Sequence, residues 1–130
     1  MRYLGIDYGK KRIGLALGEQ GLTSPLLVYF KDKNIFSKIE KICLEEKIDK
    51  IILGFSQDLE QEIKNFKKQL TKRLEIPIIL QDESLTTREA ADTMLVSLAR
   101  RKSRREKVDA VAAAQILAAY FDSDKKEVGN

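Results

Sequence analysis

The spacing of the hydrophobic residues changes once along this 130-residue chain, and the change limits the folds open to it. At first, apolar residues alternate with others, as at Ile13, Leu15 and Leu17, which is typical of half-buried strands. After residue 34 they recur every three or four positions, as in helices, with short apolar strands between. The expected elements are strands at residues 2–7, 12–18 and 26–30, a helix at 35–47, a strand at 50–54, a helix at 59–74 and a strand at 77–81.

Strands that are joined through helices pair in parallel, whereas strands joined by short turns pair antiparallel. The element order therefore predicts an α/β fold with a mixed five-stranded sheet, made of an antiparallel three-strand meander plus two parallel strands. Thr86 and Glu89 have the spacing of a capping box and predict a third helix, and an alanine-rich fourth helix is expected over residues 108–121. We expect one domain over residues 1–121, flanked by about four helices, and a polar C-terminal tail at 122–130.

The chain contains no histidine and a single cysteine, Cys43. This excludes Ser-His-Asp and Cys-His catalysis, an internal disulfide and zinc sites built on histidine. Cys43 falls on the apolar side of an expected helix, where we expect it to pack in the core. Acid–base or metal chemistry must then come from carboxylates, Lys, Tyr or water, which favours hard metal ions with oxygen ligands.

No apolar segment reaches the roughly 20 residues that span a bilayer. The chain also begins at once with a strand pattern rather than with the layout of a signal peptide. We therefore expect a cytoplasmic protein.

Acidic residues stand at three places that would meet at one edge of the expected sheet. Asp7 ends the first strand, the pair Asp82 and Glu83 follows the last strand, and Asp109 opens the last helix. Each acid also has a structural explanation, as a turn residue or at a helix start. Neighbouring side chains on an extended chain point opposite ways, so the pattern alone leaves the choice between Asp82 and Glu83 open. Three carboxylates held close together repel unless a cation lies between them, and oxygen ligands select Mg²⁺ or Mn²⁺.

The net charge is +4, and positive residues are concentrated beside those acids. Lys10, Lys11 and Arg12 form the turn after the first strand. A second basic run leads into the last helix and consists of Arg100, Arg101, Lys102, Arg104, Arg105 and Lys107. A solvated surface would explain either run, but their positions favour binding to the phosphates of a nucleic acid. Aromatic residues suited to stacking are few, with Tyr8 the nearest, so we expect recognition of shape and phosphate rather than of base sequence.

Three segments resemble the YqgF (RuvX) family, RNase H-like proteins described as Holliday junction resolvases or pre-16S rRNA nucleases. They are YLGIDYGKKRIGLAL at residues 3–17, DESLTTREA at 82–90 and KVDAVAAAQIL at 107–117. The resemblance runs from residue 1 to about 121. It implies an RNase H-like fold with acidic site residues at Asp7, Glu83 and Asp109, and so selects Glu83 over Asp82. Two features depart from the family: Ser84 replaces the usual Arg, and Gly54 is followed almost directly by a helix rather than by a longer loop.

The resemblance leads us to expect a Mg²⁺- or Mn²⁺-dependent endonuclease for structured nucleic acid that trims the 5′ end of precursor 16S rRNA. In this reading Asp7, Glu83 and Asp109 bind the metal ions and the basic turn positions phosphates. One alternative is a Holliday junction resolvase with the same chemistry, acting on four-way DNA and working as a dimer rather than a monomer. A second is a non-catalytic nucleic-acid-binding module of ribosome assembly. An actin-like ATP-binding fragment also fits the first hairpin, but the chain is too short for the two domains that such enzymes need.

Overall fold

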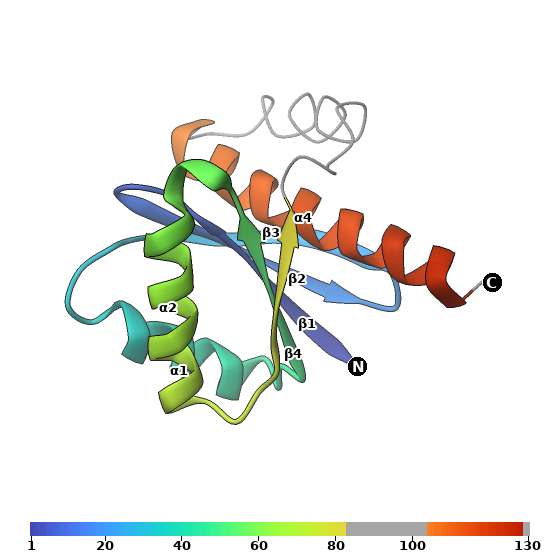
Figure 1. Cartoon of the computed structure of the whole chain (residues 1–130), viewed down its shortest axis with the longest axis horizontal. Coiled ribbons are helices and arrows are strands. Elements are labelled where there is room, and N and C mark those ends of the chain that lie inside the picture. Colours follow the sequence, from blue (N-terminus) through green and yellow to red (C-terminus); the bar gives the residue numbers. More distant parts are fainter. Residues whose placement is uncertain (83–103, 129–130) are drawn as a thin grey trace.

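The structure is a computed structural model that describes residues 1–82 and 104–128. The described residues form the strands β1 (Arg2–Tyr8), β2 (Arg12–Glu19), β3 (Leu22–Phe30), β4 (Lys50–Phe55) and β5 (Ile78–Asp82). These strands form one sheet in the order β3-β2-β1-β4-β5, and Figure 1 shows their arrangement. β1 pairs antiparallel with β2, which pairs antiparallel with β3, while β1, β4 and β5 run parallel. The predicted meander plus two parallel strands is therefore confirmed.

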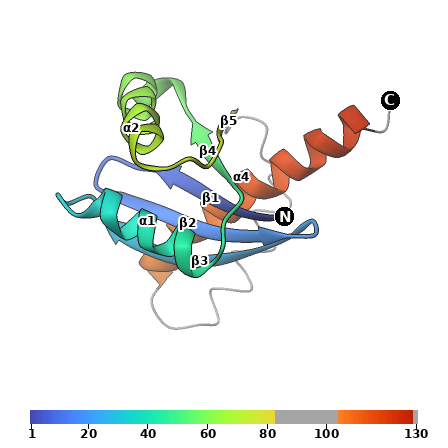
Figure 2. The same cartoon turned by 90° about the horizontal axis from the view of Figure 1, so that it is seen from below.

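Helices cover both faces of the sheet. α1 (Ile35–Glu45) and α2 (Glu60–Arg73) pack on one face, and α4 (Arg104–Val128) crosses the strands on the other, as Figure 2 shows from below. A single 3₁₀ turn, η1 (Gln57–Leu59), connects β4 to α2, so the expected short connection after Gly54 is present. The helix predicted from Thr86 lies outside the described residues. Among the helices that are described, none is both long and apolar enough to cross a membrane.

Alternation along β1 divides its side chains between the two faces of the sheet. Leu4 and Ile6 belong to the apolar layer beneath α1 and α2. Tyr3 packs instead against the layer beneath α4, and a Cβ placed on Gly5 would meet that helix directly. Because side chains alternate along a strand, Asp7 lies on the α4 face.

Two elements differ by more than two residues from the ranges that the pattern predicts. β3 begins at Leu22 rather than at residue 26, because it is an edge strand and tolerates Pro25, which lies opposite Ala16 where the register shifts. The last helix begins at Arg104 rather than at residue 108 and continues to Val128. Its first turns therefore include the second half of the basic run.

Cys43 lies on the buried side of α1, as the sequence predicts, and is 3% exposed. Burial, assisted by the Glu40 carboxylate, raises the pKa of the Cys43 thiol from 9.0 to about 11. Since the thiolate is the nucleophile, this shift alone lowers the reactive fraction at pH 7 about 100-fold. We expect Ellman's reagent to label Cys43 slowly in the native protein and rapidly in guanidinium, and equal rates would contradict the burial.

Candidate functional site

The carboxyl ends of three parallel strands meet at one edge of the sheet. Ile6 of β1 pairs with Leu53 of β4, and Gly54 of β4 pairs with Gln81 of β5. Continuing this register by one residue sets Asp7 beside Gly54, in one row with Gln81. Paired residues of neighbouring strands lie on the same face of a sheet, so this row lies on the face that α4 covers.

Asp82 lies on the other face. It pairs with Phe55, whose side chain packs against the core layer beneath α1 and α2. Asp82 therefore does not share the face of Asp7. Glu83, the acid that the family resemblance selects, lies outside the described residues, as do Ser84 and three cations of the basic run, Arg100, Arg101 and Lys102.

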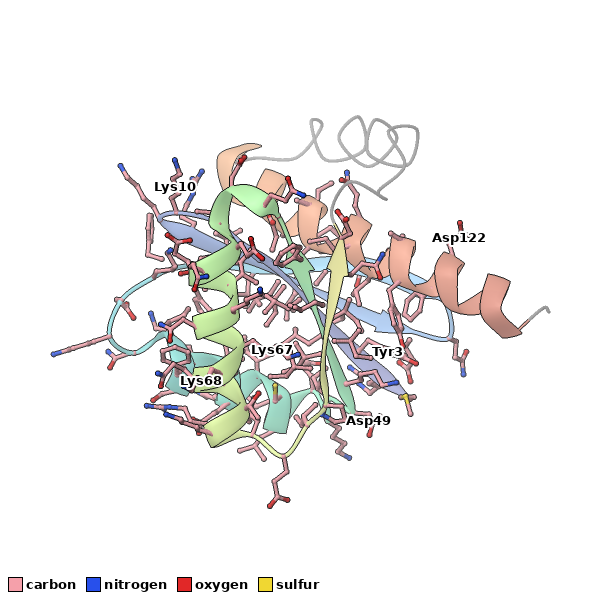
Figure 3. The ribbon with its side chains drawn as sticks, in the orientation of Figure 1. Tyr3, Lys10, Asp49, Lys67, Lys68 and Asp122 are labelled. Carbon is pink, nitrogen blue, oxygen red and sulfur yellow. The ribbon has the colours of Figure 1, made fainter. Side chains whose placement is uncertain are left out.

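α4 runs over β1 in the direction that brings its first turns to the Asp7 end of the strand. A Cβ added to Gly5 would lie only 2.7 Å from the backbone oxygen of Ala113. Farther back on β1, the Tyr3 ring lies 4.9 Å from the ring of Phe121, and Figure 3 shows Tyr3 toward the C-terminal half of α4. Moving forward along β1 therefore means moving toward the N-terminus of α4.

The same alignment brings the backbone position of Asp109 toward Asp7. Asp109 precedes Ala113 by one turn of α4, about 6 Å along the helix axis. Asp7 follows Gly5 by two residues of β1, about 7 Å along the strand. Residues four apart lie on the same side of a helix, so position 109 is on the stripe of α4 that faces the sheet. The backbone positions of two of the three predicted acids thus lie at the same end of the same face of the sheet.

The turn between β1 and β2 places cations at this edge. Lys10 and Lys11 are exposed and Arg12 is partly buried, and Figure 3 shows Lys10 at the tip of the hairpin, directed away from the sheet. The Gly9 N–H donates a hydrogen bond of 2.9 Å to the Arg12 carbonyl oxygen. A Cβ on Gly9 would lie 2.7 Å from that oxygen, so the tight turn requires glycine there.

Gln81 is a further candidate site residue, which the sequence pattern did not indicate. It is 7% exposed, and it is the buried polar residue of the described part of the chain. Its side-chain amide makes no hydrogen bond within that part, although an amide can both donate and accept. A buried amide without a partner is costly, which suits a group that contacts a ligand beside Asp7. A polar residue that follows the apolar residues Ile78, Ile79 and Leu80 is the sequence signal that could have found it.

The aromatic residue exposed near this edge is Phe30 rather than Tyr8. The Tyr8 ring packs on Phe66 with 5.0 Å between ring centroids, and the Lys31 ammonium lies 4.1 Å from its centre. Phe30, at the end of β3, is 70% exposed. Tyr29 and Phe30 are adjacent in a strand, so only one of them can face the core. This adjacency is the sequence signal that one of the two rings is exposed.

The donors at this edge suit a hard divalent cation. The chain has no histidine, and Cys43 is buried beneath α1, on the face opposite Asp7. The described donors near the edge are oxygens, the Asp7 carboxylate and the Gln81 amide, and the two other expected ligands are also carboxylates. Such oxygens prefer Mg²⁺ or Mn²⁺. The described residues do not by themselves supply a set of three ligands, since Glu83 lies outside them.

Comparison with known proteins gives a family match over most of the chain. A family model described as RuvX, Holliday junction resolvase, matches residues 1–123. A protein of Syntrophus aciditrophicus is 36% identical, in an alignment that covers 98% of this chain and 92% of that protein. A protein of Agathobacter rectalis is 33% identical, with 94% of this chain and 95% of that protein covered. Both carry the name pre-16S rRNA nuclease.

Solved structures resemble the whole fold. RuvC of Thermus thermophilus, in complex with a Holliday junction substrate, superposes with a TM-score of 0.63 at 15% identity, covering 95% of this chain and 96% of that chain. The fowlpox virus resolvase in complex with Holliday junction DNA gives a TM-score of 0.59 at 14% identity, covering 95% and 98%. At these identities the likeness shows the fold alone, which is RNase H-like, as the resemblance implies.

Proposed function

The chain belongs to the RuvX family, and from this membership we propose that it is a divalent-metal-dependent nuclease that hydrolyses phosphodiester bonds in structured nucleic acid. One structural observation carries the proposal. The end of β1 that bears Asp7 lies at the same edge of the sheet as position 109, on the stripe of α4 that faces the sheet. Relatives named as nucleases align with nearly the whole chain and over more than nine-tenths of their own length, which supports the same activity for this chain.

In this proposal Asp7, Glu83 and Asp109 hold Mg²⁺ or Mn²⁺. When bound, such ions supply positive charge that stabilises the developing negative charge and lowers the pKa of water. The chain's own part is to hold the phosphate in place. Lys10 and Lys11, exposed on the hairpin beside Asp7, contact its non-bridging oxygens. Water attacks phosphorus and the bond to the leaving oxygen breaks. Because the chain has no histidine, a carboxylate, lysine, tyrosine or second water takes the proton from the attacking water, and the leaving oxygen takes up a proton from solvent.

The names of the relatives favour precursor 16S rRNA as the substrate. We propose further that the cut lies at its 5′ end. Basic residues at the start of α4 support a nucleic-acid surface around the proposed site, because Arg104, Arg105 and Lys107 fall in the first turns of that helix. The second candidate is four-way DNA, since the two structural neighbours described above are resolvases seen with Holliday junctions.

A cleavage assay tests the proposal directly. Purified protein is incubated with a structured precursor-16S RNA and, separately, with a four-way DNA junction, each with Mg²⁺, Mn²⁺ or EDTA. We expect metal-dependent cuts in the RNA near the mature 5′ end and little cutting of the junction. Preferential, paired cutting of the junction would favour the resolvase. Tight binding to RNA without any cut, equal in EDTA, would show a binding module and overturn the proposal.

A further inference from the structure

Phe30 differs from the other large apolar side chains that the described residues leave in solvent. Met1 and Leu44 are single exposed residues, which are ordinary on protein surfaces. Leu22 lines a hollow at the other end of the β2–β3 hairpin, where Arg2 is paired with Glu19 rather than left for a ligand. Phe30 instead lies opposite Arg12 in the β2–β3 pairing and lines a surface hollow of about 490 Å³. The rest of the hollow is the basic turn, formed by Gly9, Lys10, Lys11 and Arg12.

The pairing of the strands places Phe30 on the same face of the sheet as Asp7. Asp7 pairs with Gly14, which pairs with Val28, and these three form one row. Arg12 and Phe30 lie two residues beyond that row on β2 and β3, and side chains two apart share a face. Phe30 is therefore two strands across and two residues along from Asp7, a separation of about 12 Å between backbones.

A ring and a set of cations around one hollow match the two halves of a nucleotide. The flat face of a base stacks on an aromatic ring, and its phosphate is attracted by lysine. The backbone bond of 2.9 Å from the Lys31 N–H to the Lys11 carbonyl oxygen ties the end of β3 to the turn, so ring and cations keep their spacing. Tyr8 cannot stack on a base, because its ring already packs against Phe66 and the Lys31 ammonium.

We propose that Phe30 and the basic turn form a stacking site for an unpaired nucleobase next to the phosphate that Asp7 addresses. A base inside a continuous duplex has both faces covered by its neighbours, so only a base in a loop, bulge, junction or single-stranded flank can offer a face to Phe30. The inference rests on the proposed nuclease function and adds its substrate class: a strand with an unpaired nucleotide beside the cut.

The test measures binding and cleavage separately. The Asp7→Asn protein, without metal ions, is titrated into RNA hairpins that carry 2-aminopurine either unpaired at the junction with the stem or paired within it. We expect quenching of the unpaired probe only. Phe30→Ala should remove the quenching and weaken binding of the unpaired RNA about 5- to 150-fold, the range for loss of one stacked base. Phe30→Tyr should retain both.

Two controls separate stacking from other effects. Leu44→Ala removes an exposed apolar side chain on α1 and should change nothing. Lys10→Ala combined with Lys11→Ala should weaken paired and unpaired RNA alike and reduce the salt dependence of binding. If Phe30→Ala binds both RNAs as the parent does, or alters only self-association, the stacking site is wrong. If stacking is seen but the parent cuts no substrate with Mg²⁺ or Mn²⁺, the nuclease proposal fails while the stacking site stands.

Discussion

Asp7→Asn is expected to lower the cleavage rate at least about 100-fold, more than is usual for loss of a residue that only supports a metal ligand. Asn has the shape of Asp without its charge, so the end of β1 keeps its packing while a divalent cation loses an anionic ligand. The rate is measured in single turnover with Mg²⁺. Calorimetric titration with Mn²⁺ should show weakened binding, and the melting temperature should stay close to that of the parent.

Asp82, the last residue of β5, provides a matched control at the same edge of the sheet. Asp82→Asn makes the same chemical change on the opposite face of the sheet. Asp82 pairs with Phe55, whose side chain lies on the face that α1 and α2 cover. We expect it to cleave nearly as fast as the parent, whereas Glu83→Gln should behave like Asp7→Asn. Loss of activity in Asp82→Asn together with normal activity in Glu83→Gln would reverse the choice between these two acids.

The sheet could be predicted because its cause is local. Alternation at residues 12–18 and helical spacing at 35–47 define the element types, and the rule for crossovers then fixes which strands run parallel. The start of β3 could not be predicted in this way. A register shift opposite Leu15 and Ala16 inserts an extra residue into β3, so the alternation does not continue across Pro25.

The candidate site, like the fold, contains residues that local sequence pattern indicates and residues whose role depends on strand pairing. Asp7 and Asp109 could be proposed from the sequence because each was expected at the end of an element, and element ends gather at one edge of such a sheet. In the structure position 109 lies in the second turn of α4 rather than at its start. For Gln81 and Phe30 the sequence offers only a weak signal, because their place beside Asp7 and Arg12 depends on which residues they pair with across strands. Strand register places Gln81 in one row with Asp7 and pairs Phe30 with Arg12. The local pattern of apolar residues in the sequence does not contain this register.

Gly5→Ala is expected to reduce both stability and activity. The added Cβ would lie 2.6 Å from Leu117 Cγ and 2.7 Å from the Ala113 backbone oxygen, and a helix backbone cannot move aside alone. Overpacking of this kind costs about 1–3 kcal/mol, or a fall in melting temperature of roughly 5–10 °C. Relief requires α4 to lift from the sheet, which moves position 109 away from Asp7. Since a displacement of about 1 Å can cost 100-fold in rate, we expect cleavage to fall about 10- to 100-fold.

Gly18→Ala is the control for this prediction because it makes the same change beneath the same helix. Its Cβ would meet the Phe121 ring at 2.9 Å, the far end of a side chain that can rotate, and Gly18 pairs with Tyr3 at the opposite end of β1 from Asp7. We expect a smaller loss of stability and nearly parental cleavage. Calorimetry and single-turnover rates on the two variants, measured well below both melting temperatures, separate the effects. Equal losses of activity in both would show that general destabilisation, rather than the position of α4 over Asp7, controls the reaction.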